Sequence, residues 1–298
     1  MTGLMTPRRE TPGDRVERIA ALDRVASVLR NQVNRRVRED SPARDALHGV
    51  WLGHPLHPAL AQLPLGAWLS AALFDLLPGE SRNADLLIAT GLVTALPAAS
   101  AGLVDYSRLH SEQMRVGVAH AGLNSLALTC YGASLVARMR GRRGLGRLLA
   151  AAGLAAASTS AYLGGHLAYR QAAGPNHAED VRHLLDAEWH TIGQLDEFEE
   201  DVPTPRLVKD VPVVVVRHGM HVDVLAGRCS HQSGPLHAGE VVHNEQGACL
   251  RCPWHGSLFR LEDGAVVHGP ATAPQPRFEV WTDNGTVRVR MPGAGPGE

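Results

Sequence analysis

The chain of 298 residues has few cysteines, a single lysine and no excess of charge of either sign. Four cysteines are too few for the disulfide scaffold of a small secreted domain, so that class of protein is excluded. The formal net charge is −1, without the basic excess that binds phosphate backbones, and we expect no nucleic-acid partner. The length is sufficient for two domains of ordinary size.

The sequence also has no recognisable export signal near its N-terminus. Arg8 and Arg9 form a twin arginine, but polar and charged residues follow where an export signal has an apolar core. We therefore expect the N-terminus to stay in the compartment where it is synthesised.

Long apolar runs are present between residues 59 and 169. They are four segments, approximately residues 59–77, 86–104, 116–137 and 148–169. Each is long enough to cross a bilayer at about 1.5 Å per residue. A soluble bundle of buried helices is the alternative, but residues 86–104 and 148–161 carry no charge and show no polar face. We therefore predict a four-helix transmembrane bundle over residues 47–170.

A histidine–proline motif precedes and opens the first of these segments. It reads His54-Pro55-Leu56-His57-Pro58, and Leu63-Pro64-Leu65-Gly66 and Asp75 follow it. Through these motifs the region from Leu47 to Tyr169 resembles a family of bacterial four-helix membrane domains of unknown function. The resemblance implies the architecture of a membrane domain. Together with the four apolar segments, we expect a multi-pass protein of the bacterial inner membrane, in contact with lipid.

The residues before the bundle predict a basic amphipathic helix from Arg15 to Val37, within an N-terminal tail of residues 1–46. Apolar residues recur there at steps of three and four, with arginines between them. Such a helix could lie on an anionic membrane surface or pack on the following domain.

The arginines on either side of the apolar segments give conflicting evidence on topology. Ten arginines precede residue 50 and favour a cytoplasmic N-terminus, whereas five arginines between residues 138 and 147 favour the opposite orientation. We give more weight to the N-terminus, because a charged tail without an export signal is hard to translocate. Four crossings then place the C-terminal domain in the cytoplasm.

The C-terminal part shows a strand pattern after a polar linker of residues 171–187. Short apolar runs such as Val213–Val216 alternate with glycines, which predicts a small all-β, antiparallel domain over residues 188–293. Five acidic residues lie between Asp196 and Asp201. They are either a solvated loop or a docking patch for a basic partner.

Two short loops of this domain each offer one thiolate and one imidazole. Cys229-Ser-His231 is followed, after twenty residues, by Cys252-Pro-Trp-His255. A Rieske centre needs two cysteines on one iron and two histidines on the other, so each loop supplies one ligand to each iron.

Zinc is the alternative metal, and Cys249 would then be a fifth candidate ligand. Zinc ligands are usually separated by two to four residues, but one residue separates Cys229 from His231. Cys249 lies in a strand-like run, and we interpret it as a small buried residue.

Further motifs support a resemblance to the Rieske family over residues Glu188 to Met291. Gly269-Pro270-Ala271 resembles the proline loop that covers the cluster, and Phe278-Glu-Val280 resembles the strand after it. The resemblance implies a 2Fe-2S cluster with four ligands. These are Cys229, His231, Cys252 and His255.

The cluster loops resemble the ferredoxin type of this family. Quinol-oxidising members carry an additional cysteine in each loop, whereas Gln232–Gly234 and Trp254 occupy those places here. Ser257 could donate a hydrogen bond to a cluster sulfur, which would raise the reduction potential.

The expected function is transfer of single electrons to or from a redox partner protein by a membrane-anchored Rieske domain. We expect no oxygenase catalytic subunit, because its mononuclear iron needs a large further domain and only seven residues follow Met291. One alternative is an oxidoreductase whose bundle binds quinone or haem. Another is a redox sensor.

Polar residues near the helix ends predict a second redox or metal site at one face of the bundle. They are His57, Asp105, His120 and His166. In an up-and-down bundle all four fall at the same face, and polar groups inside a bundle need partners. Asn124 lies one turn from His120, where it could orient the ring. The alternative is that these side chains are interfacial and reach for water.

Overall fold

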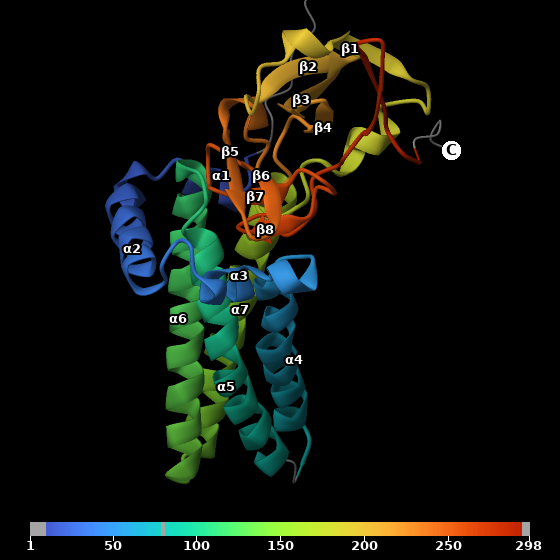
Figure 1. Cartoon of the computed structure of the whole chain (residues 1–298). Helices are drawn as coiled ribbons and strands as arrows, with labels where there is room; N and C mark the ends of the chain where they lie inside the picture. Colours follow the sequence, from blue (N-terminus) through green and yellow to red (C-terminus); the bar gives the residue numbers. More distant parts are fainter. Residues whose placement is uncertain (1–9, 79–80, 294–298) are drawn as a thin grey trace, which may run out of the picture. The chain divides into compact units, whose positions relative to one another are not determined.

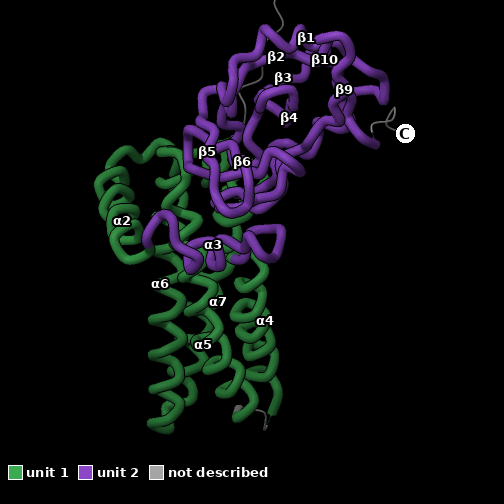
Figure 2. Tube along the Cα trace, viewed as in Figure 1, with its two compact units in different colours: residues 1–37, 57–173 green, residues 38–56, 174–298 purple. Residues whose placement is uncertain are grey.

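The computed structural model describes residues 10–78 and 81–293 (Figure 1). The chain forms two compact units, residues 1–37 with 57–173 and residues 38–56 with 174–298 (Figure 2). The first unit is helical and the second is built mainly from strands. Segment 38–56 therefore belongs to the strand-rich unit, although it precedes the long helices.

The helical unit begins with two short helices and a turn between them. They are α1 (Pro12–Glu17), a 3-10 turn (Ala20–Leu22) and α2 (Asp23–Arg36). Thr11 caps α1, because its hydroxyl accepts the Asp14 N–H while the Asp14 carboxylate accepts the Thr11 N–H. The prediction of one helix from Arg15 to Val37 is wrong, since Ile19 adopts a non-helical conformation.

The sequence predicts that this segment lies either on a membrane surface or on the following domain. In the structure it packs on the long helices. Ala26 and Val33 of α2 are buried, and Ala26 packs with Tyr106 and Met114. The Tyr106 hydroxyl donates to the Ala26 carbonyl at 3.2 Å. Only part of the predicted apolar stripe is buried in this contact, and Val25 remains exposed.

Four long helices form the rest of this unit. They are α4 (Leu56–Leu76), α5 (Ser81–Tyr106), α6 (Ser111–Met139) and α7 (Arg143–Gly165), which continues into a π-helical turn (His166–Arg170). Small residues let the helices approach closely: Gly153 of α7 lies against the ring of Tyr131 on α6, and that ring stacks on Trp68 of α4. The predicted four-helix bundle is confirmed.

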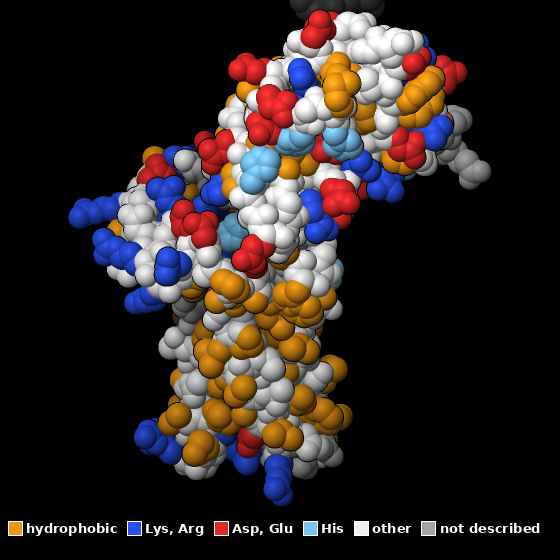
Figure 3. Space-filling view, viewed as in Figure 1, with side chains coloured by type: hydrophobic (Ala, Val, Ile, Leu, Met, Phe, Trp, Pro, Cys, Tyr) orange, Lys and Arg blue, Asp and Glu red, His pale blue; other side chains and the backbone are white. Residues whose placement is uncertain are grey.

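Three helical stretches of the described chain are long and apolar enough to cross a membrane: Leu56–Leu76, Arg82–Tyr106 and Arg143–Arg170. Helix α6 is not among them, because polar residues such as His120 and Asn124 interrupt its apolar run. Hydrophobic side chains cover the middle of the long helices (Figure 3).

The strand-rich unit contains three antiparallel sheets, in the orders β1-β10-β9, β2-β3-β4 and β5-β6-β7-β8. The strands are β1 (His190–Gln194), β2 (Thr204–Val208), β3 (Val211–His218), β4 (His221–Ala226), β5 (Glu240–Asn244), β6 (Gly247–Arg251), β7 (Leu258–Arg260), β8 (Val266–His268), β9 (Glu279–Asp283) and β10 (Thr286–Arg290). The turn between β9 and β10 is Asn284-Gly285, and both residues have positive φ as this hairpin turn requires. The predicted all-β domain is confirmed.

The valine run of β3 joins the two hydrophobic cores of this unit. Successive side chains of a strand point to opposite faces. Val213 and Val215 accordingly lie in a core with Phe278, while Val214 and Val216 lie in the core that contains Cys229 and Cys252. The second core therefore connects the central strand with the loops that carry the predicted ligands.

Two segments outside the predicted β domain also pack into this unit. The predicted linker contains a 3-10 helix (Glu179–His183), and Val181 and Leu185 are buried in the first core. Segment 38–56 contains α3 (Pro42–His48), which Ser41 caps and the left-handed Gly49 ends.

Candidate metal centre

The two loops that carry the predicted ligands have matching backbone turns. In the first loop, after β4, the Ser233 N–H donates to the Cys229 carbonyl at 2.8 Å. In the second, between β6 and β7, the Gly256 N–H donates to the Cys252 carbonyl at 3.1 Å, and Gly256 has a φ of +77°. Each turn brings its histidine back over its cysteine.

The structure brings the four predicted ligands together in one place. The Cys229 and Cys252 side chains are within hydrogen-bonding contact and are 1% and 3% exposed. The ring centres of His231 and His255 are 5.0 Å apart, with the rings perpendicular. Two buried thiols beside two partly exposed imidazoles form the donor set of a 2Fe-2S centre, so the residues present fit that group.

The pKa values of the two thiols shift in opposite directions, although backbone N–H groups favour the thiolate at both. A hydrogen bond with the Cys229 thiol lowers the pKa of Cys252 to about 7; the backbone N–H groups of Trp254 and His255 act in the same direction, and burial opposes them. The hydrogen bond with Cys252, together with burial, raises the pKa of the Cys229 thiol, while N–H groups of its own loop oppose this. Each sulfur thus faces backbone donors that stabilise its anionic form, which is the form that binds metal.

A buried glutamine that the sequence analysis did not identify holds the first loop. Gln275 is 1% exposed, and its Oε1 accepts the Ser230 N–H at 2.9 Å. Its Nε2 donates to the carbonyls of Ala226 and Arg228 at 2.8 and 2.6 Å. No local motif identifies this side chain, because its partners lie more than forty residues away.

The predicted proline loop contacts the second ligand loop. The Ala271 N–H donates to Ser257 Oγ at 2.9 Å, and the Ser257 carbonyl accepts the Cys252 N–H at 2.8 Å. Ser257 is fully buried. Its hydroxyl hydrogen is still available to a further acceptor, since Oγ acts as the acceptor toward Ala271.

Segment 38–56 contacts the other side of this proline loop. Asp45 Oδ1 accepts the Gly269 N–H at 2.8 Å, and Asp45 Oδ2 lies 2.8 Å from His268 Nδ1. The predicted linker reaches the first ligand loop in a similar way, through a hydrogen bond from the His177 N–H to the Ser230 carbonyl at 2.9 Å. Both chain segments that flank the long helices therefore support the loops.

Cys249, the additional candidate zinc ligand, is fully buried in β6. Its thiol lies 3.9 Å from Asn244 Oδ1 and 3.7 Å from the Gly247 carbonyl. The Cys249 thiol thus has its contacts at the first end of β6, whereas Cys252 comes directly after the other end of this strand.

The predicted second site in the bundle is only partly assembled. The ring centres of His57 and His120 are 6.1 Å apart, and both side chains line a cavity of about 120 Å³. Among the described residues, neither Asp105 nor His166 lines this cavity. His166 instead lies 2.6 Å from Glu17 of α1.

Helix geometry explains this correction. His120 contacts Ser160 of α7, and His166 lies six residues further on, about 9 Å along the axis at 1.5 Å per residue. His57 contacts Ala98 of α5, and Asp105 lies about 10 Å beyond it on the same measure. The four residues share one face of the bundle but not one depth.

Helix α6 also carries an ion-pair cluster that the sequence analysis did not foresee. Arg138, considered above with the arginines of the α6–α7 turn, has a side chain only 1% exposed. Its Nη1 lies 2.7 Å from Asp75 and 3.1 Å from Asp85. A buried arginine needs such partners inside an apolar bundle.

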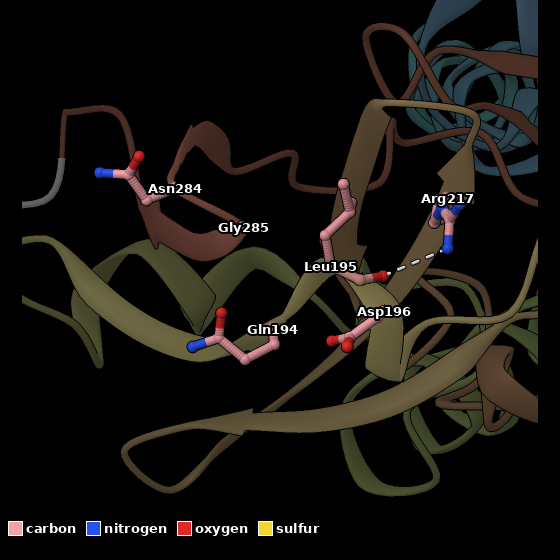
Figure 4. A pocket seen from close by; sticks show the side chains of 6 residues that line it. All are labelled: Gln194, Leu195, Asp196, Arg217, Asn284 and Gly285. Atoms are coloured by element: carbon pink, nitrogen blue, oxygen red, sulfur yellow. Dashed lines mark hydrogen bonds between the residues drawn. The ribbon is translucent and has the colours of Figure 1, made fainter.

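The acidic residues between Asp196 and Asp201 make specific contacts within the strand-rich unit. Glu200 accepts the Gly219 N–H at 2.7 Å, and Asp201 lies 2.5 Å from His218 and 3.3 Å from His243. Arg217 Nη1 donates to the Leu195 carbonyl beside a hollow of about 350 Å³ (Figure 4). None of the residues lining this hollow belongs to the ligand loops.

Comparison with known proteins identifies both units. Residues 188–279 match the family described as Rieske [2Fe-2S] domain, and residues 53–176 match a family described as predicted membrane protein (DUF2231).

Relatives of the strand-rich unit include electron-transfer proteins. The anthranilate 1,2-dioxygenase ferredoxin subunit of Burkholderia cepacia is 33% identical over 105 residues, which are 35% of this chain and 94% of the relative. A Rieske domain-containing protein of Homo sapiens is 30% identical over 114 residues, covering 34% of this chain and 73% of its own length. The solved ferredoxin of carbazole 1,9a-dioxygenase from Nocardioides aromaticivorans IC177 is 27% identical, covers 34% of this chain and 96% of its own, and has a TM-score of 0.33.

The helical unit matches a family of predicted membrane proteins and contains three apolar helices of sufficient length to cross a membrane. The strand-rich unit matches the anthranilate 1,2-dioxygenase ferredoxin subunit over 94% of that relative's length. A Rieske domain implies a 2Fe-2S cluster and one-electron chemistry. The chain therefore belongs to the Rieske [2Fe-2S] family through residues 188–279, and this domain is joined to a predicted membrane protein domain of the DUF2231 family.

Proposed function

We propose that the protein is a membrane-anchored Rieske electron carrier that passes single electrons to or from a protein partner. Cys229 and Cys252 would bind one iron of the cluster, and His231 and His255 the other. The cluster supplies reversible one-electron transfer, and the residues of the two loops fix where it exchanges electrons.

The observation that carries this proposal is the difference in exposure between the two ligand pairs. Both cysteines are buried, whereas both imidazoles are partly exposed. Trp254 lies beside His255, with ring centres 6.4 Å apart, and is 50% exposed. Electrons would enter and leave through the imidazole edge, where an exposed aromatic side chain offers apolar contact area to a partner.

We further propose that the helical unit anchors the carrier in the bacterial inner membrane, with the Rieske domain in the cytoplasm. The three apolar helices and the membrane family match support an anchor. The many arginines before residue 50 support a cytoplasmic N-terminus.

The test of the cluster is its composition in the purified chain and in ligand variants. A 2Fe-2S centre predicts about two irons and two acid-labile sulfides per chain. We expect Cys252→Ala and His255→Ala to lose them. Cys249→Ala and His237→Ala are matched controls, because the first is a buried thiol outside the proposed ligand set and the second an exposed imidazole. A purified chain that holds one zinc and no iron would overturn the proposal.

A second candidate function is an oxidoreductase that takes its electrons from a ligand in the bundle. The cavity between His57 and His120 favours it.

A further inference from the structure

Three side chains of types that bind metal ions lie together in the strand-rich unit, outside the two ligand loops. They are Asp201, His218 and His243. His218 Nδ1 lies 2.5 Å from Asp201 Oδ1, and His243 Nε2 lies 3.3 Å from Asp201 Oδ2. One ligand atom from each residue falls within 4.8 Å of the other two. The three atoms are therefore close enough together for one ion to contact all of them.

The three residues come from segments that are distant in the sequence. Asp201 lies in the loop before β2, His218 ends β3 and His243 lies in β5. Strands β3 and β5 belong to different sheets, yet the His218 and His243 ring centres are 5.9 Å apart. The packing of the two sheets, and not a local motif, brings the ligands together.

Backbone contacts hold Asp201 in place without an ion. The Asp201 N–H donates to the Arg217 carbonyl at 3.0 Å. The neighbouring Glu200 carboxylate accepts the Gly219 N–H at 2.7 and 2.9 Å. Asp201 has a φ of +58°, a left-handed conformation that aspartate adopts more readily than most residues. A ligand fixed in this way loses little conformational freedom when it binds an ion.

The donor set selects the kind of metal ion. Two imidazoles and one carboxylate suit zinc, whereas Mg²⁺ and Ca²⁺ prefer a shell of oxygen atoms. Zinc at about 2.0–2.1 Å from its ligands holds neighbouring ligand atoms of a tetrahedron about 3.3 Å apart. The Asp201–His243 pair already has this spacing, and the shorter Asp201–His218 pair opens as the ion enters.

The site is accessible to an ion from solution. The side chains of Asp201 and His243 are 42% and 61% exposed, and that of His218 is 22% exposed. Five acidic residues between Asp196 and Asp201 add attraction for a divalent cation. Ion pairing alone is the alternative interpretation, but pairs of this exposure contribute little to stability. It also gives no reason for a second imidazole on the same carboxylate.

We propose that Asp201, His218 and His243 bind one Zn²⁺ ion, with water as the fourth ligand. The imidazoles bind as neutral rings, and protons that they carry beforehand are released to the solvent. The ion joins the loop before β2 to the end of β3 and to β5. None of its ligands belongs to the proposed 2Fe-2S cluster, so this site is independent of the proposed function.

The binding test is a calorimetric titration of the full, untagged chain in detergent with zinc chloride. We expect one zinc ion per chain, bound at a site whose affinity falls tenfold or more in Asp201→Asn and in His243→Ala, because each variant loses one of three ligands. Asparagine keeps the size of the side chain and tolerates the left-handed backbone. Circular dichroism confirms that both variants are folded.

The matched control is His221→Ala. His221 pairs with His218 across the β3–β4 hairpin and its side chain is 67% exposed, but it does not belong to the cluster of three ligands. This variant should bind zinc as the unmodified chain does. Magnesium chloride should neither bind to the site nor displace zinc from it, because the site lacks the oxygen ligands that Mg²⁺ prefers.

A second measurement uses stability. Zinc that binds only the folded chain raises the thermal midpoint of the strand-rich unit. We expect this increase in the unmodified chain and in His221→Ala, and its loss in Asp201→Asn and His243→Ala.

Four results would overturn the site. They are no zinc bound to the unmodified chain, equal affinity in all variants, displacement of zinc by magnesium, or an equal zinc-dependent increase of the midpoint in all variants. Zinc held by the two ligand loops instead would persist in Asp201→Asn and His243→Ala and disappear in Cys252→Ala.

Discussion

At the scale of single residues, Ser257 is a buried hydroxyl close to Cys252 that we expect to tune the proposed cluster. It is fully buried, it accepts the Ala271 N–H at 2.9 Å, and its own carbonyl accepts the Cys252 N–H. The hydroxyl hydrogen can therefore be donated toward the proposed cluster. A hydrogen bond to a cluster sulfur stabilises the more negative, reduced form and raises the reduction potential.

We expect Ser257→Ala to lower the reduction potential of the cluster, because it removes this donor. Protein-film voltammetry or an optical redox titration gives the midpoint. Ser230→Ala is the matched control, since Ser230 is also buried but its hydroxyl donates to the Ala273 carbonyl at 2.8 Å. An unchanged midpoint in Ser257→Ala, or an equal decrease in both variants, would contradict the assignment.

The residues that the sequence alone could identify are those whose chemistry is set by local spacing. The Cys-x-His and Cys-x-x-His loops are of this kind, because each brings its own thiol and imidazole together within one turn. Gln275 and Asp45 were missed, because the groups they bind lie far away in the sequence and no local motif marks these two residues. His166 and Asp105 were misplaced for a related reason: counting helix ends gives the face of a bundle and not the depth.

At the scale of elements, α3 packs on the proline loop of the Rieske domain. Asp45 of α3 contacts both the Gly269 N–H and His268, and Asp40 lies 3.7 Å from the other ring nitrogen of His268. A hydrogen bond with Asp45 raises the pKa of His268 above its ordinary value. The stability that this pair contributes is fully present below that ordinary value and is lost as the pH rises through the raised one.

We expect Asp45→Asn to lower the thermal midpoint of the strand-rich unit, and more so at pH 6 than at pH 9. The loss of charge-assisted hydrogen bonds costs about 1.5–3 kcal/mol at the lower pH. Part of the difference should persist at high pH, because the Gly269 N–H loses its charged acceptor at every pH. The measurement is the melting temperature of both proteins between pH 5.5 and 9.

Asp40→Asn is the control for this prediction, because the Asp40 side chain is 82% exposed and contributes little to an ion pair. A difference between wild type and Asp45→Asn that does not change with pH would show that the pair with His268 adds nothing to the backbone contact.

Elements were predicted well where one sequence signal covers the whole segment, either a long apolar run or a regular alternation of short apolar runs and glycines. The four long helices and the β domain satisfy this condition. The segment from Arg15 to Val37 does not satisfy it. Its apolar pattern continues across Ile19, but the helix breaks there, and α1 and α2 pack separately on α6. Bidentate pairing of Arg115 with Asp23, at 2.7 and 2.8 Å, holds α2 there. A pattern of neighbouring residues cannot predict such a contact, because the two partners lie far apart in the sequence.

At the scale of the whole molecule, the two chain segments that lead from the helices to the Rieske domain both end in its loops. Residues 38–56 contact the proline loop, and the segment after Arg170 contacts the first ligand loop. Both of these segments are therefore packed parts of the strand-rich unit.

The topology of the chain in the membrane is the last prediction. We expect the chain to partition with membranes, to require detergent for extraction and to have both termini in the cytoplasm. The arginines around α2 that precede the first apolar helix support a cytoplasmic N-terminus. If the more polar α6 crosses together with the three apolar helices, four crossings return the chain to the same side. Fusions of alkaline phosphatase and of green fluorescent protein after residue 293 test this, since the first is active only outside the cytoplasm and the second fluoresces only inside it. An active phosphatase fusion would place the proposed cluster outside and reverse the orientation, while extraction by salt alone would show that the apolar helices do not cross the membrane.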